Sequence, residues 1–242
     1  MALFPRAPLT AAATLRRFVT LVTNHYGSFY GRTQGWAGHS DALNLWDRWL
    51  GSDRTVIPNQ ISLAAQGSMA AFFGALEGQS DRPVLCKNNS LNASAHLVAE
   101  ALPTARFVCL ERSRESLALS LLMARLEIHG TACKSYGLGK ATSRRSGDPV
   151  EDVCHQVFFH EELSDMQQKR IGPERFLRVQ FEDICNDPRR FVLRISREML
   201  GELAEVASMD PGLVPFTTSK RAQGEELRVR IRATFERLGE RL

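Results

Sequence analysis

The stretch from residue 107 to residue 120 is Phe107-Val-Cys-Leu-Glu-Arg112-Ser-Arg-Glu-Ser-Leu-Ala-Leu-Ser120. An apolar run over residues 105–110 predicts a strand, and the leucine spacing over residues 115–128 predicts a helix. Arg112 then lies in the turn between them, and Ser120 follows eight residues later. Eight helical residues span about 12 Å and return nearly to the same face. One anion at the end of the strand is therefore within reach of both side chains.

Strands and helices alternate on both sides of this stretch. Residues 83–87 are a short apolar run that predicts a strand, and residues 175–181 predict another. This order implies right-handed crossovers and a parallel sheet, so the expected fold class is a three-layer α/β domain with helices flanking the sheet. Ligands of such sheets bind at the carboxyl ends of the strands. Further helices are predicted over residues 10–24, 61–77, 91–102, 191–200 and 224–241.

Several helix ends carry local signals. Asp148 before Pro149 predicts a helix start, with Glu151 completing a capping box, and Asp187 before Pro188 predicts another. Gly130 and Gly201 predict helix ends. Five glycines over residues 27–51 predict turns in a segment that also carries all three tryptophans, and the small and polar residues 131–147 predict a surface loop.

The composition is that of a globular protein. The chain has 242 residues, of which 43% are hydrophobic and 24% charged, and no linker divides it, so we expect one domain over residues 1–242. A net charge of +4 suits an anionic small ligand and is too weak to indicate DNA binding. No apolar run approaches the roughly 20 residues of a membrane span.

Cysteine usage indicates a reducing compartment. The five cysteines are an odd number without a C-x-x-C pair, which predicts buried free thiols rather than disulfides or a zinc site. We therefore expect a cytoplasmic protein. Residues 1–40 contain no Asp or Glu, and an organelle transit peptide is the alternative interpretation of that segment.

Lys87 is an unusual residue in this chain. Of 31 basic residues only 5 are lysines, and this one ends the predicted strand over residues 83–87. Ammonium and guanidinium groups are not equivalent, so a lysine at a strand end is a candidate functional residue. The alternative is an ordinary solvated strand end.

Four ordered segments resemble a known family. Lys87-Asn-Asn is followed by a helix, then by Leu102-Pro-Thr-Ala-Arg-Phe107 and its strand, then by Arg112 and Ser120, and finally by Val179-Gln-Phe-Glu-Asp-Ile184. This succession is similar to the core of sulfotransferases that use 3′-phosphoadenosine-5′-phosphosulfate (PAPS), in particular the bacterial and tyrosylprotein-type members. The resemblance covers residues 82–201 and implies a P-loop-NTPase-like parallel sheet.

The resemblance implies a role for three residues. Arg112 and Ser120 would bind the 3′-phosphate of the donor nucleotide. Lys87 would lie near the oxygen that bridges the 5′-phosphate and the sulfonate, where an ammonium stabilises the charge of the leaving group. The implied activity is sulfonate transfer from PAPS to a hydroxyl or amine acceptor, with no metal ion.

The chain also departs from the family pattern. Ser113 and Arg114 stand where Asp and Pro are usual, and Phe181 replaces a common tyrosine. The segment Phe4-Pro-Arg-Ala-Pro-Leu-Thr10 has no glycine or preceding strand, so we expect the phosphate-binding loop and the first central strand to be missing. One interpretation is a shortened form that is inactive as it stands, and the other is that its N-terminal part rebuilds the sheet.

Other interpretations remain open at this stage. Arg112 could pair with Glu111 or Glu115 on the surface, and Ser120 could be a small packing residue. His25 and His39 are candidate general bases, though both suit a turn-rich surface. The alternative function is a degenerate nucleotide-binding or protein-interaction domain. A phosphate-transferring P-loop protein is disfavoured because no G-x-x-x-x-G-K-[ST] motif occurs.

Overall fold

The computed structural model describes residues 28–29, 32–33, 43–53, 56–80, 83–139, 147–201, 209, 212–216 and 225–239. The chain forms two compact units, Met1–Thr104 and Ala105–Leu242. The predicted helix over residues 10–24, the segment over residues 4–10 and the two candidate bases His25 and His39 lie outside the described residues.

The first unit is built around a cluster of aromatic side chains. It begins with the antiparallel pair β1 (Ser28–Phe29) and β2 (Arg32–Thr33), followed by the helices α2 (Leu43–Leu50) and α3 (Leu63–Ser80). Trp46 and Trp49 are buried, and their rings lie 5.6 and 5.9 Å from that of Phe73. The prediction of turns is therefore wrong for α2. Its apolar residues recur at helical spacing, and burial against α3 outweighs the many glycines around them.

The predicted strand over residues 83–87 is absent from the described part of the chain. Residues 83–88 form neither helix nor strand, and Leu85 is 97% exposed. The side chain of Asn88 accepts a hydrogen bond from the Ser90 N–H (2.7 Å) and so begins a 3₁₀-helix, η1 (Asn89–Ala93). The helix α4 (Ala95–Ala101) follows, within the helix predicted over residues 91–102.

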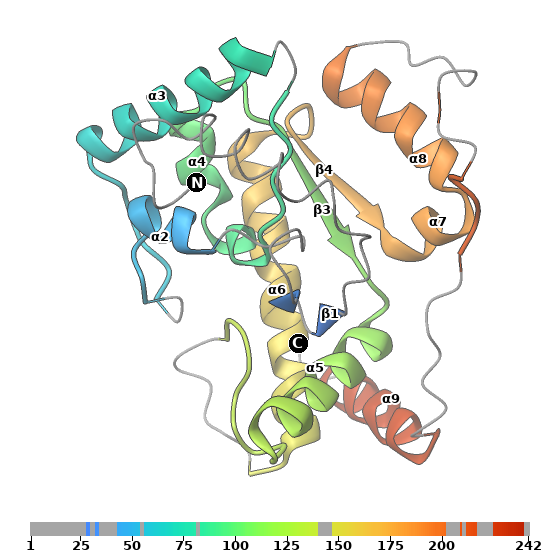
Figure 1. Cartoon of the computed structure of the whole chain (residues 1–242). Coiled ribbons are helices and arrows are strands. Elements are labelled where there is room, and N and C mark those ends of the chain that lie inside the picture. The colour runs from blue at the N-terminus through green and yellow to red at the C-terminus, as the bar shows by residue number, and fades with distance from the viewer. Residues whose placement is uncertain are drawn as a thin grey trace. The chain divides into compact units, whose positions relative to one another are not determined.

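The second unit contains a parallel pair of strands. β3 (Phe107–Glu111) and β4 (Phe176–Gln180) pair in register from Phe107 with Phe176 to Glu111 with Gln180. The helices α5 (Arg114–His129) and α6 (Pro149–Ile171) connect them, as a parallel crossover requires (Figure 1). The fold is therefore mixed α/β and mostly helical, with a smaller parallel sheet than predicted. β3 and β4 are hydrogen-bonded directly to each other.

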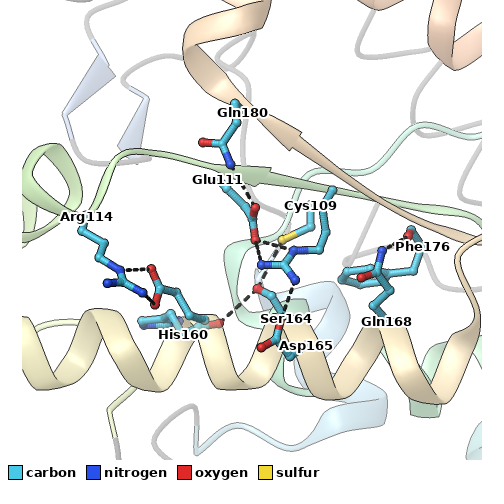
Figure 2. A network of polar contacts seen from close by, with 11 residues as sticks. Cys109, Glu111, Arg114, His160, Ser164, Asp165, Gln168, Phe176 and Gln180 are labelled. Carbon is cyan, nitrogen blue, oxygen red and sulfur yellow. Dashed lines mark hydrogen bonds and ion pairs between the residues drawn. The ribbon is translucent and has the colours of Figure 1, made fainter. Parts of the chain in front are cut away.

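The two faces of this sheet differ in chemistry. On one face, Leu177 and Val179 of β4 are buried against Ile184 of α7 (Phe181–Asn186) and Met199 of the π-helical turn η2 (Ser196–Leu200). The helix α8 (Pro188–Ile195) adds its apolar side to the same cluster. The other face turns polar side chains toward α6, as Figure 2 shows.

The predicted helix ends of this unit are confirmed. Asp148 accepts a hydrogen bond from the Val150 N–H (2.9 Å), and Asp187 accepts one from the Arg190 N–H (2.9 Å). Gly130 and Gly201 both adopt φ of 69°, the left-handed conformation that ends a helix and that favours glycine. These boundaries are set by a few neighbouring residues, which is why the sequence predicts them.

The C-terminal helix α9 (Glu225–Gly239) packs on α5 and α6. Its Ile231 is fully buried in a cluster with Val153 and Cys154 of α6. Its arginines bond to acids of the other two helices. These pairs are Arg228 and Arg232 with Glu115, Arg230 with Asp148, and Arg237 with Glu151.

The cysteines only partly match the sequence prediction. All five are free, and Cys154 and Cys185 are buried, but Cys86 and Cys133 are exposed because their segments lie on the surface. Burial raises the pKa of the Cys154 thiol to about 12. Among the described residues, no helix combines the length and the apolarity that crossing a membrane requires.

Candidate functional site

The carboxyl ends of β3 and β4 place two residues of interest beside each other. Glu111 pairs with Gln180 at the last position of the ladder, and the next residues are Arg112 and Phe181. The guanidinium carbon of Arg112 lies 5.3 Å from the centroid of the Phe181 ring. Its Nε atom is buried and has no hydrogen-bond partner among the residues that the structure describes. A buried donor in that condition is the kind of group that an anionic ligand would satisfy.

The two acidic residues nearest to Arg112 in the sequence accept hydrogen bonds from other side chains. The Glu111 carboxylate accepts hydrogen bonds from Arg178 (2.6 Å) and Gln180 (3.2 Å). The Glu115 carboxylate accepts them from Arg228 and Arg232 (both 3.0 Å). These bonds lower the pKa of Glu115, the bond from Arg228 most strongly. Within the described residues, therefore, the interpretation of Arg112 as a partner of Glu111 or Glu115 is wrong.

The turn that follows Arg112 is held by two helices. The Ser113 N–H donates to Glu182 of α7 (3.4 Å). Arg114 donates twice to Glu161 of α6, at 2.8 and 3.0 Å, and lies 4.9 Å from the Phe158 ring centroid. Hydrogen bonding to Glu161 raises the pKa of Arg114. Although Ser113 and Arg114 replace the usual Asp and Pro, the turn remains anchored on both sides.

Ser120 lies in the second turn of α5 and is half-buried. It is four residues beyond Ser116, so the two hydroxyls lie on one side of the helix. Ser116 in turn accepts a hydrogen bond from the Ser113 hydroxyl (2.8 Å). The hydroxyl groups of Ser113, Ser116 and Ser120 therefore form a row that begins at the turn carrying Arg112 and continues along α5.

Lys87 belongs to the first unit, whereas Arg112 and Ser120 belong to the second. Its side chain is exposed and lies directly before Asn88, the residue that begins η1. The predicted strand end at this position is wrong, since residues 83–88 form no strand.

A polar network on the α6 face of the sheet was not predicted from the sequence. Arg178 bonds both to Glu111 and to Asp165 of α6. Nearby, the Cys109 thiol lies 3.5 Å from the Ser164 hydroxyl, which donates to the His160 carbonyl (3.0 Å) (Figure 2). Burial raises the pKa of the Cys109 thiol. One feature of the sequence could have indicated this network, namely the arginine inside the otherwise apolar strand Phe-Leu-Arg-Val-Gln. A charge in such a strand requires a partner.

This network ties both strands to α6 and leaves Arg112 outside it. Among the described residues, no group of three or more His, Cys, Asp or Glu side chains is arranged to hold a metal ion. The candidate site is therefore the end of the sheet, formed by Arg112 with its aromatic neighbour and by the hydroxyl row on α5.

A family model described as the sulfotransferase family matches residues 10–201. Because this match covers well over half of the chain, the protein belongs to the sulfotransferase family. The match ends where the resemblance in the sequence ends, but it begins at residue 10 rather than at residue 82. Searches of curated proteins and of solved structures found no match.

Proposed function

We propose that this protein transfers a sulfonate group from PAPS to a hydroxyl or amine acceptor, as a bacterial or tyrosylprotein-type sulfotransferase. Family membership supports the reaction class. The observation that supports the choice of donor concerns Arg112, at the carboxyl end of a parallel strand. Its buried Nε lacks a hydrogen-bond partner within the described part of the chain. The carboxyl end of a strand is the position at which α/β sheets bind nucleotides and other ligands.

Arg112 and Ser120 are proposed to bind the 3′-phosphate of the donor. A guanidinium offers paired N–H donors in one plane, which suits two oxygens of a phosphate. A serine hydroxyl donates one further hydrogen bond. The donors that Arg112 presents are of the type a phosphate needs, and the neighbouring Glu111 and Glu115 are both held by other arginines.

Lys87 is proposed to stabilise the leaving group. The donor supplies an activated sulfonate, and negative charge grows on the phosphate oxygen as the bond to sulfur breaks. A compact ammonium near that oxygen lowers the barrier, and its effect is largest where water is excluded. Orientation of the acceptor adds to this effect and requires no metal ion. The unpaired cysteines support a reducing, cytoplasmic setting for this chemistry.

Calorimetric titration with adenosine 3′,5′-bisphosphate and with adenosine 5′-phosphate tests the proposal. The wild-type protein should bind the bisphosphate more tightly. In Arg112→Met this preference should fall by about 30-fold or more, the loss expected for a charge-assisted phosphate contact. The matched control is Arg106→Met, directly before the other end of β3, where the exposed side chain donates to the Glu174 carbonyl. It should leave both affinities unchanged.

Two outcomes of this experiment would count against the proposal. Equal affinity of the wild-type protein for the two nucleotides would remove the evidence for a 3′-phosphate site. A preference that survives in Arg112→Met would place the phosphate elsewhere. Tight binding without sulfonate transfer to any of a panel of hydroxyl and amine acceptors would favour a degenerate nucleotide-binding domain instead.

A further inference from the structure

Arg112 is supported by an aromatic ring where an arginine of a folded protein often has a carboxylate. The Phe181 ring centroid lies 5.3 Å from the guanidinium carbon, within the distance at which a cation and a ring attract each other. Both residues are half-buried, and each is the first residue after its strand. The parallel register of β3 and β4 therefore sets this contact, since the last paired residues are the ones directly before them.

The position of Phe181 is itself fixed by its surroundings. It begins α7, directly after β4, and its ring lies 6.4 Å from that of Phe216 in an edge-to-face arrangement. Phe216 is held near α7 because its N–H donates to the Cys185 carbonyl (3.0 Å). The next residue, Glu182, accepts the Ser113 N–H (3.4 Å) and so fixes the backbone just beyond Arg112.

A ring and a carboxylate hold an arginine in different ways. A carboxylate bonds to the N–H groups in the guanidinium plane and neutralises the charge, which leaves few donors for a ligand. A ring contacts the flat face of the guanidinium and uses none of those donors. Arg178 illustrates the first case, because Glu111 and Asp165 both bond to it. Arg112 differs from it, because a ring lies 5.3 Å from its guanidinium carbon and no carboxylate of the described residues bonds to it.

We propose that Phe181 is a positioning residue that orients the Arg112 guanidinium while leaving its in-plane donors to the 3′-phosphate of the nucleotide. This inference rests on the proposed function, since it assigns a support to the residue that binds that phosphate. It also explains how a phenylalanine serves at a position where the family commonly has tyrosine, because the contact needs the ring and not a hydroxyl.

The test is the ratio of two dissociation constants, for adenosine 5′-phosphate and for adenosine 3′,5′-bisphosphate. Phe181→Leu should lower this ratio by about tenfold, the effect of losing a partly desolvated cation and ring contact. Phe181→Met fills a similar volume without a ring and should lower the ratio equally. This second variant provides the same test if Phe181→Leu does not fold. Phe181→Tyr keeps the ring and should retain the wild-type ratio.

The matched control is Phe216→Leu. It removes the neighbouring ring but leaves the ring beside Arg112, so the ratio should stay within about twofold of wild type. The double variant Arg112→Met with Phe181→Met should have the ratio of Arg112→Met alone, because without the guanidinium the ring has nothing to orient.

Several results would overturn this inference. If Phe181→Met weakened both nucleotides equally, the ring would contact the base and not support Arg112. If it left the ratio unchanged while Arg112→Met abolished the preference, Phe181 would have no positioning role and the proposed function would stand. If Arg112→Met itself left the ratio unchanged, the proposed function would fail first, so the two failures are distinguishable.

Discussion

Arg178 and Arg112 belong to the same small sheet, one inside a strand and one directly after a strand, and they have opposite environments. Arg178 is an interior residue of β4 whose guanidinium bonds to Glu111 and Asp165. Arg112 follows β3 and lies beside the ring of Phe181, and no described residue bonds to its buried Nε. A guanidinium that is fully bonded within the fold contributes to stability. One that keeps its donors available can bind an anion.

The contrast between the two arginines predicts that removing each guanidinium changes the free energy of unfolding by a different amount. Arg178→Met leaves two carboxylates without their cation, and the side chain of Glu111 is only 19% exposed. We expect the free energy of unfolding to fall by about 2–3 kcal/mol, somewhat less than for a fully buried pair. Arg112→Met should change it by less than about 1 kcal/mol. Urea unfolding measures both.

Arg106→Met serves as the control for the loss of any arginine from this sheet and should be nearly neutral, because its side chain is exposed. Equal losses in Arg178→Met and Arg112→Met would show that both guanidiniums are structural, and the contrast between them would disappear.

The arginines of α9 resemble Arg178, because their guanidinium groups also bond to carboxylates of the fold. Glu115→Gln removes the carboxylate that binds Arg228 and Arg232 and should lower the free energy of unfolding by about 1 kcal/mol at pH 7. The exposed Glu226→Gln, on α9 itself, is the control. Urea unfolding of the three proteins at several pH values is the measurement.

The pH dependence of that loss follows from the lowered pKa of Glu115. A carboxylate whose pKa is lower in the folded state stabilises the fold above its unfolded pKa of about 4.3, and this contribution disappears as pH falls through the folded value. The difference between wild type and Glu115→Gln should therefore be constant from about pH 7 to pH 5 and shrink below about pH 4. A difference that grows on acidification would contradict the assignment.

The smallest expected effect concerns Gln180, the partner of Glu111 in the ladder. Its amide donates to the Glu111 carboxylate at 3.2 Å in an exposed position, so Gln180→Ala should cost about 0.5 kcal/mol in urea unfolding. A loss as large as that of Arg178→Met would mean that Glu111 depends on Gln180 and not on its cation.

The sequence predicted features that depend on neighbouring residues. Asp148, Asp187, Gly130 and Gly201 mark helix ends through caps and a left-handed conformation that involve only the adjacent turn. Arg112 was likewise placed correctly at the end of a strand, because the apolar run before it is short and clearly bounded.

Features that depend on distant residues were missed. Arg178 and Glu111 are 67 residues apart, and their pairing follows from the register of two strands that no local pattern specifies. The same register brings Phe181 to Arg112. The strand predicted over residues 83–87 failed for the same reason, because an apolar run becomes a strand only where a partner is available.

The most direct test of the contrast between the two arginines is an NMR titration of their Nε–H groups with adenosine 3′,5′-bisphosphate, with each signal assigned by its Arg→Met variant. We predict that the Arg112 Nε–H signal moves downfield and saturates with the bisphosphate but not with adenosine 5′-phosphate, because a phosphate oxygen becomes its hydrogen-bond acceptor. The Arg178 signal should stay in place, since Glu111 already accepts from its Nε. An Arg112 signal that remains unmoved at saturation would contradict the account.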